Sequence, residues 1–270
     1  MKNPIGIMQG RLSAPSSIGP QIFPVSGWRD EFATASVIGF DTIEWLVDAG
    51  SFAQNPLLSA SCRAEMQQVA TTCNVRADSV CAHCVLEWRP FDQGGEERMA
   101  NFPSLISAAS SAGMERIIVP ILEAATIARA PSPIHAAKIF FSAVQTAEQV
   151  GIDLAFEMDR PALECADFIQ LLKSPRARLC YDAGNATSLG RDIVAEIKLL
   201  LPLVSEIHLK DRRVGGASQP LGAGDTRFAD FFNYLTTQHW SGPFVLETPV
   251  LDNPVTQARN NLAFVKTFLT

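Results

Sequence analysis

The order of its segments constrains this chain more than any other feature. Eight short apolar runs each end near a polar residue, and a helix-like segment follows each run. The runs are Ile5–Gln9, Thr42–Leu46, Ala77–Cys84, Arg116–Leu122, Ile152–Met158, Arg178–Asp182, Ser205–Leu209 and Phe244–Glu247. Eight such units of about 34 residues predict the α/β class and a single (β/α)8 TIM barrel. An open doubly wound sheet is the alternative, although it usually has fewer strands.

Local sequence signals place the helices between these strands. The helices are expected to begin near Trp28, Ala60, Glu96, Ile134, Ala162, Ile193, Phe228 and Val255. A polar residue and a proline, typical of helix starts, occur together at Ser132–Pro133, Asp159–Pro161 and Asn253–Pro254. Glycines typical of helix ends stand at Gly39, Gly113 and Gly151. Two connections, Gly10–Gly27 and Arg212–Arg227, are long for barrel loops, which is typical of functional lids.

Composition and charge exclude several classes of protein. With 47% hydrophobic residues the chain is not disordered, and its formal net charge of −6 disfavours a nucleic-acid partner. The apolar run at the N-terminus stops at Gln9, and no stretch reaches the ~18 apolar residues of a membrane span. We therefore expect one cytoplasmic domain over residues 1–270, with no signal peptide and no membrane partner.

The six cysteines do not predict a metal or redox site. Cys81 and Cys84 form a C-x-x-C pattern, but they lie in a strand-like run, where residues three apart point to opposite faces. No second C-x-x-C pair is available to complete a zinc site. The expectation for this pair is therefore buried free thiols.

Polar side chains at the ends of four consecutive strands predict the functional site. Glu157 and Asp182 end the fifth and sixth expected strands. His208 lies within the seventh strand, and Glu247 ends the eighth. The carboxyl ends of barrel strands meet at one rim, so these side chains should lie close together. Without a cation they would repel one another. Three carboxylates and one imidazole are donors that suit Mn²⁺, Mg²⁺, Co²⁺ or Zn²⁺. Each residue alone is more often a helix cap or an ion-pair partner, so the joint pattern carries the prediction.

The other histidines and the basic residues near this rim give weaker signals. His83 closes the third strand and is a candidate to face the rim, whereas His135 and His239 fall in helix-like segments. The candidate substrate-binding cations on or beside the rim are Arg11, Lys210, Arg212, Arg213 and Arg227. With the backbone amides of Gly222 and Gly224 they could hold a substrate phosphate, or they could be solvated loop charges.

Six motifs occur along the chain in the order that they have in a known family. They are Met8–Ser13 (MQGRLS), Gly39–Glu44 (GFDTIE), Tyr181–Asn185 (YDAGN), Ile207–Asp211 (IHLKD), Pro220–Gly224 (PLGAG) and Gly242–Glu247 (GPFVLE). Together they resemble the xylose isomerase-like TIM barrels, in the sugar isomerase and epimerase branch. Within it, the chain is most similar to L-ribulose-5-phosphate 3-epimerases, and D-tagatose 3-epimerases have similar strand ends. The likeness covers almost the whole chain and is specific for the fold and the metal site rather than for the substrate.

The resemblance implies roles for individual residues. The family's ligands for one divalent metal ion fall on Glu157, Asp182, His208 and Glu247. In the ketose epimerases two of these positions, here Glu157 and Glu247, also form the acid/base pair. A substrate contact of the family falls on Asn185, and its cationic positions fall on Lys210 and Arg213.

The chain departs from the family close to the expected substrate. Ala223 stands where a glutamate is common, and Arg227 stands where an aspartate often occurs. His83 takes a position where similar sequences often have aspartate. These differences bear on the substrate and not on the metal site.

We therefore expect a metal-dependent isomerase that epimerises a ketose or ketose phosphate at C3. The metal would stabilise an enediolate while two glutamates remove and return a proton on opposite faces. An aldose–ketose or hydroxypyruvate-type isomerase on the same site is the nearest alternative. The others are a sugar-binding barrel without catalysis and an endonuclease IV-like DNA repair enzyme, which would need several zinc ions and more than the four histidines present. The expected partner is a small sugar or sugar phosphate, and the resemblance implies a homo-oligomer.

Overall fold

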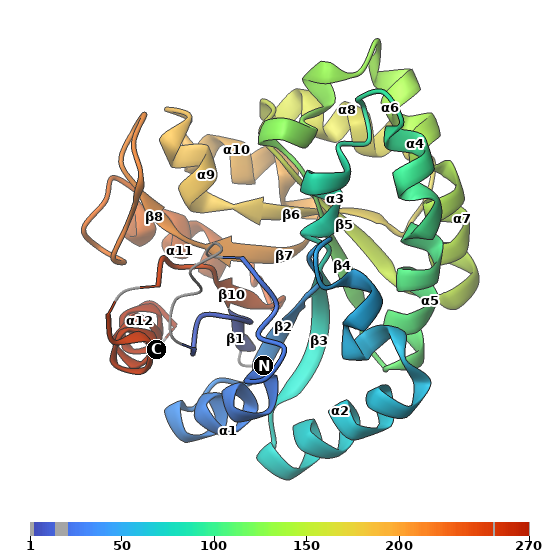
Figure 1. Ribbon diagram of the computed structural model, residues 1–270. Helices are drawn as coiled ribbons and strands as arrows, with labels where there is room; N and C mark the ends of the chain where they lie inside the picture. Colours follow the sequence, from blue (N-terminus) through green and yellow to red (C-terminus); the bar gives the residue numbers. More distant parts are fainter. Residues whose placement is uncertain (1–2, 14–20, 251, 270) are drawn as a thin grey trace.

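The computed structural model describes residues 3–13, 21–250 and 252–269, and eight of its strands close into a barrel (Figure 1). These strands are β1 (Ile5–Met8), β2 (Thr42–Leu46), β3 (Arg76–Cys81), β4 (Arg116–Ile121), β5 (Asp153–Met158), β6 (Ala177–Asp182), β7 (Val204–Leu209) and β10 (Phe244–Leu246). Each is parallel to both of its neighbours. The predicted (β/α)8 barrel is confirmed, and the open sheet is excluded because β10 pairs with β1.

Helices surround the barrel on its outside (Figure 1). They are α1 (Trp28–Ile38), α2 (Ala60–Cys73), α3 (Cys84–Trp88), α4 (Gly95–Arg98), α5 (Phe102–Ser111), α6 (Pro133–Ile139), α7 (Phe141–Val150), α8 (Ala162–Leu172), α9 (Ala183–Ser188), α10 (Ile193–Leu200), α11 (Phe228–Thr237) and α12 (Pro254–Lys266). The segments expected near Glu96 and Ile134 are each divided into two helices. α5 begins at Phe102 because Pro103 fits only in the first turn of a helix. The short α3 and α9, which follow β3 and β6 directly, have no counterpart in the predicted order.

Most of the predicted helix signals act as expected. The Ser132 side chain accepts a hydrogen bond from His135 N at the start of α6, and Asn253 accepts one from Thr256 N at the start of α12. The prediction for Asp159 is wrong. Its carboxylate accepts hydrogen bonds from Glu123 N and the Thr126 hydroxyl, so it holds the neighbouring loop rather than capping α8.

The main apolar core lies between the barrel and the helices. Aromatic rings join the layers there: Phe156 on β5 packs edge-to-face against both Phe140 and Phe168. Trp45 on β2 packs against Trp28 on α1 in the same way. Because alternate residues of a strand point inward, this outer core leaves the opposite faces of β5, β6 and β7 to line the barrel interior.

Strand register brings the predicted polar residues to one rim. Asp182 on β6 lies beside His208 on β7, and His208 lies beside Val245 on β10. Glu247 directly follows the end of β10, and Glu157 is the next to last residue of β5. The carboxyl ends of β5, β6, β7 and β10 therefore meet at the same end of the barrel.

The second long connection folds into a small hairpin over this rim. β8 (Asp211–Arg212) pairs antiparallel with β9 (Ser218–Gln219), and a glycine-rich loop leads from it to α11. Figure 1 shows the hairpin in orange beside α9. For the first long connection, residues 14–20 lie outside the described part of the chain, so its expected role as a lid is not tested.

Two expectations from composition are met within the described residues. Cys81 and Cys84 are buried and free, as expected for structural thiols. Among the described helices, none combines the length and the apolar character that crossing a membrane requires.

Candidate metal and substrate site

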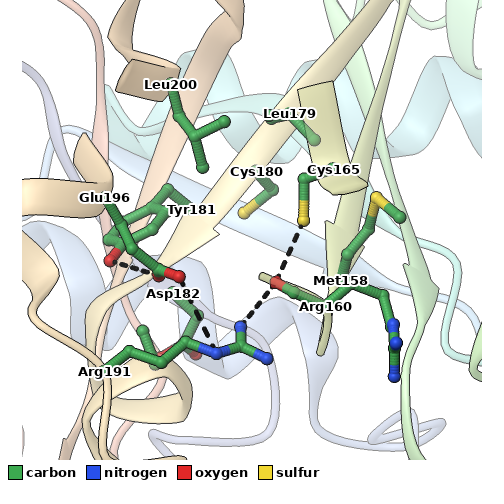
Figure 2. A pocket seen from close by; sticks show the side chains of 11 residues that line it. Met158, Arg160, Cys165, Leu179, Cys180, Tyr181, Asp182, Arg191, Glu196 and Leu200 are labelled. Carbon is green, nitrogen blue, oxygen red and sulfur yellow. Dashed lines mark hydrogen bonds and ion pairs between the residues drawn. The ribbon is translucent and has the colours of Figure 1, made fainter. Parts of the chain in front are cut away.

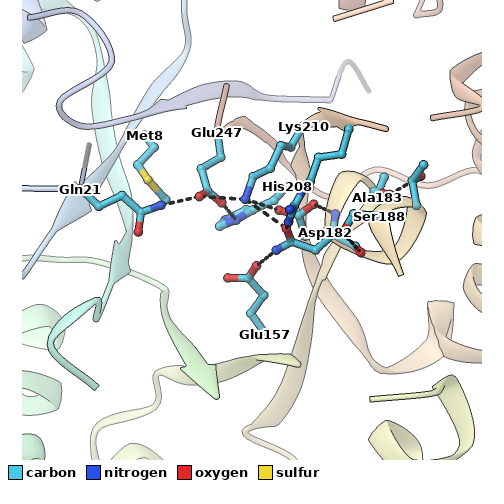
Figure 3. A network of polar contacts seen from close by, with 12 residues as sticks. Met8, Gln21, Glu157, Asp182, Ala183, Ser188, His208, Lys210 and Glu247 are labelled. Atoms are coloured by element: carbon cyan, nitrogen blue, oxygen red, sulfur yellow. Dashed lines mark hydrogen bonds and ion pairs between the residues drawn. The ribbon is translucent and has the colours of Figure 1, made fainter. Parts of the chain in front are cut away.

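Four predicted residues converge at the carboxyl end of the barrel. Each of Glu157, Asp182, His208 and Glu247 offers a donor atom, and these atoms lie within 4.8 Å of one another. The four side chains come from four different strands or strand ends, and all are at most 6% exposed. Figure 3 shows them pointing toward one another, and we call them the quartet.

The quartet is tied together by hydrogen bonds and ion pairs. His208 Nδ1 lies 3.1 Å from Glu247 Oε2. The Lys210 ammonium lies 3.0 Å from both Asp182 Oδ2 and Glu247 Oε1 (Figure 3). Asp182 has a second task, because its Oδ1 accepts a hydrogen bond of 2.7 Å from Asn185 N and so caps α9. Capping and ligation are therefore compatible for this carboxylate, since each uses a different oxygen.

The two glutamates of the quartet differ in their protonation. Burial raises the pKa of Glu157 to about 7, and the nearby Glu247 carboxylate adds to this effect. Burial alone would also raise the pKa of Glu247, but Lys210 and His208 lower it below its usual value. Glu157 therefore holds a proton more tightly than Glu247, a difference typical of an acid and a base that share one site.

Asn185 connects Glu157 to the hairpin. Its side-chain amide donates a hydrogen bond of 2.7 Å to Glu157 Oε1. Its carbonyl oxygen accepts one of 3.1 Å from Arg212 Nη1, and Lys210 Nζ lies 3.5 Å away. Arg212 also donates to the Gly216 carbonyl oxygen, which holds the hairpin closed. The orientation of the Glu157 carboxylate thus depends on the hairpin.

The predicted cations are not all at the site. Arg11 is buried there, with Nη2 3.9 Å from Glu247 Oε1. Gln21 also donates to that oxygen (Figure 3). Arg213, in contrast, is exposed and forms an ion pair with Asp225 on the surface. Arg212, which is also among the candidate cations of the sequence, lines the site, whereas the resemblance implies this place for Arg213.

Two residues of the quartet, Glu157 and Glu247, line a cavity of about 620 Å³. Lys210 lines the cavity beside these two glutamates, and Arg212 and Ser218 of the hairpin form one wall. The other wall includes apolar groups and His83, whose predicted position at the rim is confirmed. The volume is within the range of small-molecule sites, so it has room for a sugar.

A smaller cavity lies behind Asp182, outside the barrel wall (Figure 2). Its volume of about 20 Å³ has room for one water molecule and not for a sugar. Arg191 donates to the Arg160 carbonyl oxygen there, and the Tyr181 hydroxyl donates to Glu196. These contacts fasten α10 and the loop after β5 to β6, so this cavity is part of the support of the site.

The chemistry of the quartet fits a divalent cation. Two ligands on opposite sides of an ion, each bound at about 2.1 Å, stand roughly 4.2 Å apart, which is compatible with donor atoms that all lie within 4.8 Å of one another. Lys210 and Arg11 offset only part of the charge of the three buried carboxylates. Oxygen atoms with one imidazole nitrogen are donors that Mg²⁺, Mn²⁺, Co²⁺ and Zn²⁺ accept.

The sequence prediction misses a layer of charged residues just below the quartet. His208 Nε2 faces Glu44 on β2 and Glu206 on β7 inside the barrel. Arg116 on β4 contacts Glu206 from below. The signal for Glu206 is present in the sequence, because it is two residues from His208 and therefore points to the same face of the strand.

Comparisons with known proteins identify relatives of this chain. The putative L-ribulose-5-phosphate 3-epimerase SgbU of Escherichia coli is 34% identical over 85 residues, which cover 29% of this chain and 30% of that protein. L-ribulose-5-phosphate 3-epimerase UlaE of Shigella boydii is 25% identical over 241 residues, which cover 82% of this chain and 81% of that protein.

Solved structures share the fold. D-allulose 3-epimerase from Methylomonas sp. superposes with a TM-score of 0.76 at 16% identity, covering 99% of this chain and 98% of that chain. A xylose isomerase-like TIM barrel protein from Mycobacterium smegmatis in complex with magnesium superposes with a TM-score of 0.73 at 19% identity, covering 98% and 96%. The sequence profile of the family described as xylose isomerase-like TIM barrel matches residues 32–268. The chain therefore belongs to the family of xylose isomerase-like TIM barrels.

Proposed function

We propose that this protein is a divalent-metal-dependent epimerase that inverts C3 of a ketose or ketose phosphate. The observation that carries the proposal is the convergence of three carboxylates and one imidazole, two of which, Glu157 and Glu247, line a sugar-sized cavity. The names of its relatives, L-ribulose-5-phosphate 3-epimerase and D-allulose 3-epimerase, support an epimerase or isomerase that acts on sugars.

In this proposal the quartet holds one ion of Mn²⁺, Mg²⁺, Co²⁺ or Zn²⁺. The ion would bind substrate oxygens and stabilise the negative charge that develops when the proton at C3 is removed. Asp182 and His208 serve as ligands only, since Asp182 Oδ1 is committed to capping α9 and His208 is fully buried. The magnesium complex of a protein with the same fold supports a metal of this type.

Glu157 and Glu247 have the further task of moving the proton. The raised pKa of Glu157 suits an acid that gives a proton, and the lowered pKa of Glu247 keeps this carboxylate ionised, the form that can accept one. The two residues come from strands β5 and β10, which lie apart on the ring, so their carboxylates can approach C3 from different sides. Removal on one face and return on the other inverts the carbon.

The hairpin wall is the proposed place for the far end of the substrate. Arg212 and Ser218 line it, while the Lys210 ammonium is engaged by Asp182 and Glu247. If the substrate is phosphorylated, its phosphate contacts Arg212. Inorganic phosphate would then compete with the substrate, and a lack of competition favours an unphosphorylated ketose.

Exchange of substrate protons with deuterated water tests the function. Ketoses and ketose phosphates are incubated in deuterated water with the protein and each of the four metal ions in turn. After the metal is removed, NMR shows which carbon of the sugar has gained deuterium. Exchange at C3 is expected, and Glu157→Gln and Glu247→Gln should each slow it by about 10²-fold or more. Glu123→Gln, which changes an exposed carboxylate of the cavity wall, is the matched control.

Three results would contradict this proposal. Exchange at C1 or C2 without exchange at C3 indicates an aldose–ketose isomerase on the same site. Full exchange in both glutamine variants, or full activity after the metal is removed by a chelator, excludes the mechanism.

A further inference from the structure

The charged layer below the quartet is unusual for the interior of a barrel of this kind. Glu44 and Glu206 are at most 1% exposed, and they lie where branched apolar side chains normally pack. Burying a carboxylate is costly unless charges or hydrogen bonds compensate for the lost water. Apolar packing therefore does not explain why these two carboxylates are buried in the barrel interior.

Both carboxylates face the same nitrogen atom. His208 Nε2 lies 3.3 Å from Glu44 Oε1 and 3.4 Å from Glu206 Oε1. The other ring nitrogen, Nδ1, faces Glu247 in the quartet. The imidazole thus stands between the quartet above and the two carboxylates below, with one nitrogen toward each.

Further residues hold the two carboxylates in this position. The Ser79 hydroxyl donates a hydrogen bond of 3.2 Å to Glu44 Oε2, and Arg116 Nη1 donates one of 3.3 Å to Glu206 Oε2. The remaining oxygens, Oε1 of Glu44 and Oε1 of Glu206, are buried and have no hydrogen-bond partner among the described residues. Each lies within 3.4 Å of His208 Nε2, which also forms a hydrogen bond of 3.3 Å with Glu44 Oε2, so the imidazole N–H faces all three oxygens.

We propose that Glu44 and Glu206 are positioning residues that accept the Nε2 hydrogen of His208 and so turn its Nδ1 lone pair toward the metal. This inference rests on the proposed function, because it assumes that the quartet holds a divalent ion. A histidine ligand must be neutral at the nitrogen that binds, and the hydrogen bond at its other nitrogen sets which nitrogen that is. Carboxylates in that second position also make the imidazole a stronger donor to a metal.

A purely structural ion pair does not account for the arrangement. Arg116 would need one carboxylate inside the barrel, and it contacts Glu206. Glu44 comes from β2, and its side chain contacts Ser79 and His208. Orienting the imidazole ring of His208 explains why a second carboxylate is buried on the opposite side of the barrel interior.

Metal affinity tests this inference without relying on catalysis. The variants are Glu44→Gln, Glu206→Gln and the double variant, and Zn²⁺ or Mn²⁺ is titrated into each metal-free protein by calorimetry. Each single variant should bind the ion several-fold more weakly, and the double variant roughly 10- to 100-fold more weakly, with circular dichroism unchanged. Asp153→Asn removes a partly buried carboxylate that pairs with Arg176 at the start of β5 instead, and it should bind as the unchanged protein does.

NMR of the unchanged protein gives a second readout, which decides the matter if the double variant does not fold. With ¹⁵N-labelled histidine in the Zn²⁺-bound protein, His208 should carry its hydrogen on Nε2 and bind the metal through Nδ1. Hydrogen on Nδ1, or metal on Nε2, would overturn the inference. So would two ions per chain, because the Cys180 thiol lies within 4.8 Å of the Glu206 and His208 donors and could complete a second site.

The two proposals fail in different ways. If the unchanged protein binds no divalent ion, the proposed function fails. If it binds one ion and the double variant binds it equally tightly, the proposed function stands and the positioning role of Glu44 and Glu206 is wrong.

Discussion

Lys210 places a buried ammonium group between two carboxylates of the quartet. Burial alone would lower the pKa of Lys210, but Asp182 and Glu247 raise it above its usual value. The lysine is therefore charged at neutral pH and holds the two carboxylates together. A divalent ion placed beside them would feel both the attraction of the carboxylates and the repulsion of the ammonium group.

Replacement of this lysine should have opposite effects on the metal-free and the metal-bound protein. Lys210→Met leaves Asp182 and Glu247 without their nearest cation, which should lower the free energy of unfolding of the metal-free protein by about 3 kcal/mol. The rise in Tm on adding metal should be larger than in the unchanged protein, because the repulsion is gone. Thermal unfolding with and without metal measures both effects, and Lys138→Met on the exposed face of α6 is the control. An unchanged metal-free Tm would show that Lys210 does not hold the carboxylates.

Single residues show where sequence analysis reaches its limit. The four quartet residues follow from strand ends, because a barrel brings those ends to one rim whatever the loops do. Arg212 and Arg213 cannot be told apart in this way, since the turn of the hairpin decides that Arg212 faces Asn185 and Arg213 faces Asp225. The role of Glu44 depends on a contact across the barrel, which strand periodicity alone does not supply.

At the scale of elements, the hairpin β8–β9 depends on one buried carboxylate. Asp211 is fully buried and accepts hydrogen bonds from the backbone N–H groups of Gly222, Gly224 and Thr226. This folds the glycine-rich loop around the side chain. A Cβ atom at Gly224 would lie 2.1 Å from Asp211 Oδ1, so that position excludes any other residue in this loop conformation.

Substitution at this glycine should loosen the hairpin. Gly224→Ala forces the loop away from Asp211 and leaves a buried carboxylate with fewer donors, which should lower the free energy of unfolding by roughly 2–3 kcal/mol. Limited proteolysis should then cut within residues 211–227. Gly27→Ala is the control, because an added Cβ atom there would meet its nearest neighbour at an ordinary distance of 3.6 Å. Equal stability of the two variants would contradict this role of Asp211.

The order and type of the helices and strands follow from the sequence. The division of two expected helices and the additional short helices do not. Apolar periodicity places the strands, and residues such as Ser132 and Asn253 fix the helix starts through hydrogen bonds within a few residues. Asp159 has the same local pattern and yet bonds to the loop at Glu123 and Thr126, because that loop offers an N–H and a hydroxyl at the same place. A residue with a helix-cap pattern therefore fails to cap its helix where a loop distant in sequence offers better hydrogen-bond donors.

At the scale of the whole molecule, several buried titratable groups lie together in the barrel interior. The free energy of unfolding should therefore depend on both pH and bound metal. Burial raises the pKa of Glu44 to about 8 and that of Glu157 to about 7. In the unfolded chain both groups titrate near pH 4.3. Burial alone would lower the pKa of His208, but Cys180 and Glu44 raise it well above its usual value. Between pH 5 and 8 the folded protein therefore binds protons that the unfolded chain does not.

It follows that the metal-free protein should become less stable as pH rises from about 5 to 8. The free energy of unfolding should fall by several kcal/mol, because ionising the buried glutamates costs more in the folded than in the unfolded state. A divalent ion competes with these protons, so the rise in Tm that it causes should be larger at pH 8 than at pH 6. Thermal unfolding of the chelator-treated protein across this range tests the prediction, and Glu157→Gln should flatten the slope because the amide does not ionise. A metal-free protein that gains stability from pH 5 to 8 would mean that the charges inside the barrel are already balanced without a metal ion.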